Sequence, residues 1–65
     1  MNRNLLQSFL GLRVSERMTV LQHVGTKMTP QALHESNNDF SVRCLRQIES
    51  DGTVRELEQA MLRFQ

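Results

Sequence analysis

The sequence predicts an all-α fold, a compact bundle of about five short helices in one small domain spanning residues 1–65. Three observations support this prediction. Apolar residues recur at helical spacing along most of the chain. Glycines and residues that favour helix N-caps separate these apolar stripes at short intervals. No segment shows the strict apolar–polar alternation of a half-buried strand. Short connections favour packing between consecutive helices, and hence an orthogonal or Greek-key-like bundle.

The first half of the chain contains three of the expected helices. The first carries a stripe of leucines and phenylalanine and ends at Gly11. The second begins after Ser15 as N-cap and ends at Gly25, which is expected in the left-handed conformation. The third is short, about residues 30–36, and opens with Thr29-Pro30, a cap followed by proline at the first helical position. The residues expected to face inward are Leu5, Leu6, Phe9, Leu10, Met18, Val20, Leu21, Val24, Ala32 and Leu33.

The second half contains two helices joined by a sharp turn. The run Ser36–Asp39 is typical of a turn and ends in a cap, after which a strongly amphipathic helix follows. Gly52 ends that helix, Thr53 caps the next, and Glu56 completes a capping box with Thr53. The expected core positions are Phe40, Cys44, Leu45 and Ile48 on the first of these helices, and Leu57, Ala60, Met61 and Phe64 on the second.

The composition of the chain limits the cellular compartments and the classes of partner that we expect for this domain. Cys44 is the only cysteine, which favours a reducing compartment, and we expect a cytoplasmic protein. The net charge is +1, so the basic excess of a typical nucleic-acid binder is missing. No apolar run approaches the roughly 18 residues that indicate a membrane span, and the first residues do not resemble a signal peptide. We therefore expect no membrane association.

The sequence contains no pattern typical of an enzyme or a metal protein. His23 and His34 lie on different expected helices, and neither has a second ligand at metal spacing. Cys44 lies on an apolar stripe and is expected in the core, where a thiol is not activated. We predict no catalytic residues, no cofactor and no metal. The methionines Met18, Met28 and Met61 are interpreted as core filling, with a Met-rich recognition groove as the alternative.

Charged side chains off the apolar stripes supply the candidate binding residues. Arg43 and Arg46 are expected on the outer face of the helix after residue 39, and Glu16 and Arg17 on the outer face of the second helix. Seven of the eight cationic side chains are arginine, which suits planar pairing with carboxylates at interfaces. We predict that Glu16, Arg17, Arg43 and Arg46 form a partner-binding patch, with an ordinary solvated surface as the alternative.

The order of these signals resembles the death-domain family, a six-helix Greek-key adaptor module. The run 20–25 (Val-Leu-Gln-His-Val-Gly) is similar to a Leu-Ala-x-x-Leu-Gly helix, and 29–33 (Thr-Pro-Gln-Ala-Leu) to the short helix that follows it. The turn at 37–38 and the segment 44–48 are similar, in the same order, to the turn and the helix that come next in the family. The run 52–61 (Gly-Thr-Val-Arg-Glu-Leu-Glu-Gln-Ala-Met) is similar to the helix start in death domains of Rel-type transcription-factor precursors.

This resemblance implies docking with another helical domain, either homotypic or heterotypic. The chain departs from the family at Ile48, where tryptophan is usual, and it ends at Gln65, where a sixth helix would begin. Loss of that helix would expose apolar surface on its neighbours.

Two other interpretations remain open. The run 54–58 (Val-Arg-Glu-Leu-Glu) with Ala60 and Arg63 also resembles the lid helix of AAA+ replication initiators, which would make Arg55 a nucleotide sensor. A small DNA-binding or phage-type regulator would read bases with Arg43, Arg46 and Gln47. The function we predict is a non-enzymatic protein-interaction module, an adaptor or regulator, that docks through charged helical faces.

Overall fold

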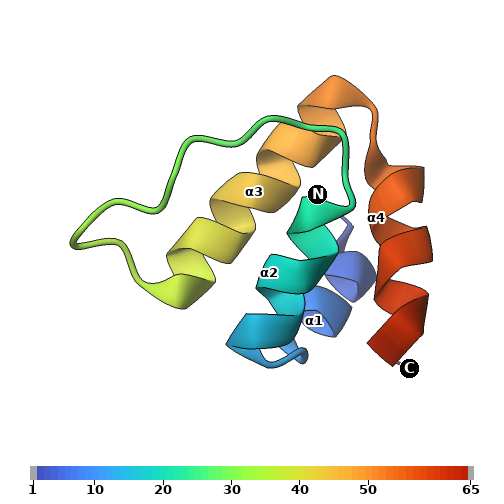
Figure 1. The fold of residues 1–65 in the computed structure, drawn as a ribbon, viewed down its shortest axis with the longest axis horizontal. Helices are drawn as coiled ribbons and strands as arrows, with labels where there is room; N and C mark the ends of the chain where they lie inside the picture. Colours follow the sequence, from blue (N-terminus) through green and yellow to red (C-terminus); the bar gives the residue numbers. More distant parts are fainter. Residues whose placement is uncertain (1, 65) are drawn as a thin grey trace.

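The structure, a computed structural model, describes residues 2–64, which form four α-helices and one short 3-10 helix and contain no strand (Figure 1). The α-helices are α1 (Arg3–Leu10), α2 (Val14–Gln22), α3 (Asn37–Asp51) and α4 (Val54–Met61), and the 3-10 helix η1 is Leu62–Phe64. The all-α fold class is confirmed. The segment from residue 23 to residue 36 is a long loop, which projects beyond the first turn of α3 (Figure 1).

The core lies where α1 packs on α3 and where α4 packs on both α2 and α3. Phe9, Val20, Ile48 and Leu57 have no exposed surface. The predicted stripes of α3 and α4 are confirmed, since their apolar residues face this core, except at Phe64, which lies in η1 and is only partly buried. The buried apolar residues are Phe9, Val20, Leu21, Val24, Phe40, Cys44, Leu45, Ile48, Leu57, Ala60 and Met61.

The predicted helix over residues 30–36 is wrong, because this segment contains only a turn at residues 33 and 34. Leu33, which was expected to face inward, is 92% exposed. Ala32 and Leu33 alone give too little apolar surface to hold so short a helix, which is marginal without tertiary packing. In addition, the carbonyl oxygens of Thr29 and Pro30 accept hydrogen bonds from Arg43 instead of from the next helical turn.

Helix α2 begins and ends differently from the prediction. Its N-cap is Arg13 rather than Ser15, and Glu16 Oε1 accepts a hydrogen bond from the Arg13 backbone N–H at 2.8 Å. The helix ends at Gln22, and Gly25 is not left-handed, because Gly52 is the only glycine with positive φ in residues 2–64. Helix α3 also begins earlier than predicted: Ser36 is its N-cap, and its side chain accepts from the Asp39 N–H at 3.0 Å.

The junction between α3 and α4 confirms the role of Gly52 and corrects that of Thr53. Gly52 has φ 73°, and the Thr53 N–H donates to the Ile48 carbonyl at 3.0 Å, so the left-handed glycine closes α3 as predicted. Thr53 is the N-cap of α4 by position, but its side chain makes no capping hydrogen bond. Its hydroxyl pairs with the Thr26 hydroxyl. Glu56 makes no capping box and accepts from the Gly25 N–H at 2.8 Å. The predicted capping pair therefore ties α4 to the chain that follows α2.

Candidate protein-interaction surface

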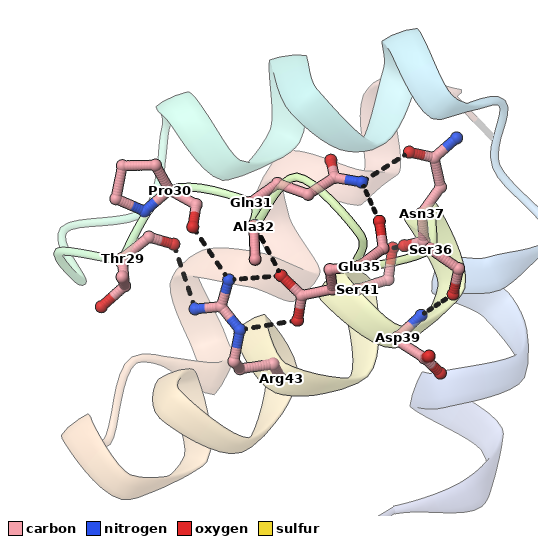
Figure 2. Close-up of polar contacts among 10 residues, drawn as sticks. All are labelled: Thr29, Pro30, Gln31, Ala32, Glu35, Ser36, Asn37, Asp39, Ser41 and Arg43. Carbon is pink, nitrogen blue, oxygen red and sulfur yellow. Dashed lines mark hydrogen bonds and ion pairs between the residues drawn. The ribbon is translucent and has the colours of Figure 1, made fainter.

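Arg43 fastens the long loop onto α3 (Figure 2). Its Nε and Nη2 atoms donate to the two carboxylate oxygens of Glu35, each at 2.8 Å, which is a bidentate ion pair. Its Nη1 donates to the Thr29 carbonyl at 3.0 Å, and Nη2 also donates to the Pro30 carbonyl at 3.1 Å. One guanidinium thus joins both sides of the loop, because an arginine fork presents several donors in a fixed plane.

Further hydrogen bonds fix the loop between these contacts. Gln31 Nε2 donates to the Glu35 carbonyl at 2.8 Å and to Asn37 Oδ1 at 3.0 Å, and the Ala32 N–H donates to Glu35 Oε1 at 3.1 Å (Figure 2). The hydrogen bond from Arg43, followed by that from Ala32, lowers the pKa of Glu35 to about 2. The hydrogen bond to Glu35 raises the pKa of Arg43. Both groups are therefore charged at neutral pH, as the ion pair between α3 and the loop requires.

A groove opens between α2, the first part of the loop and the start of α3. It encloses about 260 Å³. Met18 at its rim is 43% exposed, so the expectation that this methionine faces inward is wrong. Phe40 connects the groove to the fastened loop, because the Arg43 guanidinium lies 5.0 Å from the centre of the Phe40 ring. The groove is lined by Met18, Leu21, Gln22, Thr26, Met28, Thr29, Pro30 and Phe40.

Leu33 protrudes from the same loop. At 92% exposed it is the most exposed large apolar side chain of residues 2–64, although the backbone on either side of it is hydrogen-bonded. A single exposed leucine is ordinary on a protein surface. The distinctive feature here is that a hydrogen-bonded loop exposes the leucine to solvent three residues after Pro30, which lines an open apolar groove. We call Leu33 and the groove together the loop–groove surface.

The four residues predicted to bind a partner have different environments in the structure. Arg17 is only 8% exposed, so the prediction that it faces outward is wrong. It donates to the carbonyls of Leu10 (2.7 Å) and Leu12 (3.1 Å) and also reaches α3. Glu16 is half-buried and accepts from the Arg13 N–H, while Arg43 fastens the loop.

Arg46 is the one member of the predicted patch that is exposed and whose side chain makes no hydrogen bond or ion pair to residues 2–64. Whether any of these four side chains binds a partner stays a prediction. No sequence pattern marked Met18 and Leu33 as surface residues, because both occupied apolar positions of expected helices.

The side chains considered for other chemistry are spread over the molecule. Cys44 is 1% exposed, which confirms its place in the core, and burial raises the pKa of its thiol. Within residues 2–64, no three His, Cys, Asp or Glu side chains gather as a metal site would require. His23 lies with Arg55 and Arg63 around a surface hollow of about 350 Å³, and Arg63 Nη1 approaches His23 Nε2 at 3.1 Å.

Two of the three side chains predicted to read DNA bases are hydrogen-bonded to other residues of this chain. Arg43 is committed to the loop, and Gln47 Nε2 donates to Asp51 Oδ1 at 3.0 Å. In the part of the chain that the structure describes, no helix combines the length and the apolar character needed to cross a lipid bilayer.

Comparisons with family models, with curated proteins and with solved structures give no match to this chain.

Proposed function

We propose that this chain is a non-enzymatic protein–protein interaction module, an adaptor or regulator of the cytoplasm, that binds an apolar segment of a helical partner through the loop–groove surface. The observation that carries this proposal is the hydrogen-bonded loop, which exposes Leu33 to solvent and whose first part forms one side of a groove lined by Met18 and Met28. Methionine side chains adapt to irregular apolar ligands. A loop fixed before binding also loses little conformational entropy when the partner arrives.

The likeness to death domains belongs to this proposal. It is supported by the all-α architecture and by the junction at Gly52, where one helix closes and the next begins at once. It is weakened at residues 30–36, where the likeness implies a helix and the chain has a loop. The charged faces that were predicted to dock a partner have a smaller part in the proposal, since Arg17 is buried and Arg43 holds the loop.

A peptide selection tests the proposed function. The folded chain is immobilised and offered a random displayed peptide library, and enriched peptides are measured by fluorescence polarisation. We expect enriched peptides to share an apolar anchor and to lose at least tenfold in affinity for the Met18→Glu variant. The matched control is Leu62→Glu, which changes a side chain that is 58% exposed and lies outside the groove. Equal binding to both variants, or no enrichment, would contradict the proposal.

A further inference from the structure

We infer that a second surface of this chain binds a carboxylate side chain in an acidic segment of a protein partner. The surface is the hollow formed by α4, η1 and the residue that follows α2, and we call it the basic hollow. It encloses about 350 Å³ and shares no lining residue with the loop–groove surface, so either proposal can fail without the other. Its lining consists of His23, Arg55, Glu56, Gln59, Ala60 and Arg63.

Side chains from two separate parts of the chain meet around the basic hollow. His23 follows the last residue of α2, whereas Arg55 belongs to α4 and Arg63 to η1. All three residues are exposed. In Figure 1, α4 lies at the opposite end of the molecule from the projecting part of the loop. The basic hollow is therefore a surface of its own.

The positive charge in the basic hollow is not neutralised within residues 2–64. The Arg55 side chain makes no hydrogen bond or ion pair there, and the Arg63 side chain bonds only to His23, at 3.1 Å from Nη1 to Nε2. Glu56 is the one acidic residue of the lining, and its Oε2 accepts from the Gly25 N–H at 2.8 Å and from neither arginine. Both guanidinium groups therefore keep donors for an external anion.

The charge of the hollow matches one carboxylate. A guanidinium group only donates hydrogen bonds, so His23 Nε2 accepts from Arg63 and carries no proton in this arrangement. Arg55 and Arg63 each contribute one positive charge and Glu56 one negative charge, which leaves a net charge of +1. A single carboxylate balances this charge, and it pairs with an arginine fork through two parallel hydrogen bonds. A phosphate dianion would instead place excess negative charge beside Glu56.

The apolar part of the hollow favours a carboxylate that is carried on a side chain. Ala60 forms part of the lining, and the methylene stems of the arginines add apolar surface. These groups can contact the methylene groups of a glutamate and its neighbours in a peptide, which a small free anion lacks. Exposed charge pairs contribute little affinity, so this contact orients a partner and selects acidic ones.

An NMR titration of the isotope-labelled chain tests the inference. The probe is the capped peptide Ala-Ala-Glu-Ala-Ala at millimolar concentration and low ionic strength. Its matched control is Ala-Ala-Gln-Ala-Ala, which has nearly the same shape without the charge. We expect the glutamate peptide to shift amide signals of residues 23 and 55–63 in a saturable way, and the glutamine peptide to leave them unchanged. Added salt should weaken the binding, because it screens exposed charges.

Three arginine variants test whether this binding occurs in the hollow. Arg55→Met and Arg63→Met should each weaken it about two- to fivefold, the usual effect of removing one exposed charge pair. Arg46→Met removes the same charge from α3, outside the hollow, and should bind like the wild type. Because Arg55 has no side-chain partner within residues 2–64, its variant keeps the test valid if Arg63→Met disturbs the fold.

Equal shifts with the two peptides, or equal losses in Arg46→Met and Arg55→Met, would overturn the inference. Two further ligands test the choice of occupant. Sodium acetate that binds the hollow as tightly as the glutamate peptide would overturn the assignment to a protein segment. Inorganic phosphate that binds there more tightly than the peptide would overturn the choice of a carboxylate.

Discussion

Replacing Arg17 should destabilise this domain far more than replacing any exposed arginine, although both look alike in the sequence. Arg17 is 8% exposed and donates four hydrogen bonds. Two go to the carbonyls of Leu10, the last residue of α1, and Leu12, which lies between α1 and α2. The others go to Asn38 Oδ1 (3.0 Å) and Ser41 Oγ (3.2 Å) on α3. This one side chain therefore joins the connection between α1 and α2 to α3, the longest helix.

The expected magnitude follows from what Arg17→Met leaves behind. Ser41 keeps a partner, because its hydroxyl also donates to the Asn37 carbonyl at 2.8 Å, and the exposed Asn38 can pair with water. The two half-buried carbonyls lose their donor, and a buried acceptor left unpaired costs about 1–3 kcal/mol. We expect a loss of about 3 kcal/mol in the free energy of unfolding. A domain of this size has roughly 3–10 kcal/mol in total.

Urea unfolding followed by circular dichroism measures this loss. Arg46→Met is the matched control, because Arg46 is exposed, and its effect should stay within about 0.5 kcal/mol. Arg17→Lys should fall between the two, since an ammonium group cannot reproduce the planar fork that reaches both carbonyls and α3. If Arg17→Met proves as stable as Arg46→Met, the assigned role of the buried guanidinium is wrong.

Three further predictions concern the loop and the junctions. The ion pair of Glu35 with Arg43 should stabilise the loop fully above pH 4.5, the ordinary pKa of this carboxyl, and lose that effect as the pH falls towards about 2. NMR titration of loop amides tests this, and a titration midpoint of Glu35 near its ordinary pKa would contradict it. Thr53→Ala and Thr26→Ala should each lower the free energy of unfolding by about 1 kcal/mol, and the double variant should lower it by less than their sum, because the two hydroxyls are hydrogen-bonded to each other. Strict additivity in urea unfolding would show that the two hydroxyls act independently. Gly52→Ala should cost roughly 1–2 kcal/mol, because φ is 73° there; an unchanged unfolding midpoint would count against the left-handed turn.

The sequence predicted α3 and α4 well because each carries several apolar residues at helical spacing. Phe40, Cys44, Leu45 and Ile48 repeat over more than two turns; a helix places all four on one face, whereas a strand would turn Leu45 to the opposite face. The helix over 30–36 was predicted from a local cap signal and two apolar residues, Ala32 and Leu33. The structure of this segment is decided by Arg43, which is distant in sequence and takes the carbonyls that a helix would need.

The predicted site residues failed for a related reason. The spacing of residues shows which side chains lie off the apolar stripe. It does not show which backbone carbonyls of the folded chain need a hydrogen-bond donor. Arg17 was expected in solvent, and the carbonyls of the preceding turn draw it inward. The groove could not be predicted either, because it forms only where the loop lies beside α2 and Phe40.

The contacts between residues 25–26 and the start of α4 determine the order in which the chain can complete its structure. Glu56 pairs with the Gly25 N–H and Thr53 with Thr26, across 27 to 31 positions of sequence. During synthesis, the Gly25 N–H and the Thr26 hydroxyl therefore stay hydrogen-bonded to water, and gain their partners within the chain only after Thr53 and Glu56 have left the ribosome. The two halves of the bundle are thus completed together, and we expect a nascent chain that stops before α4 to remain unfolded.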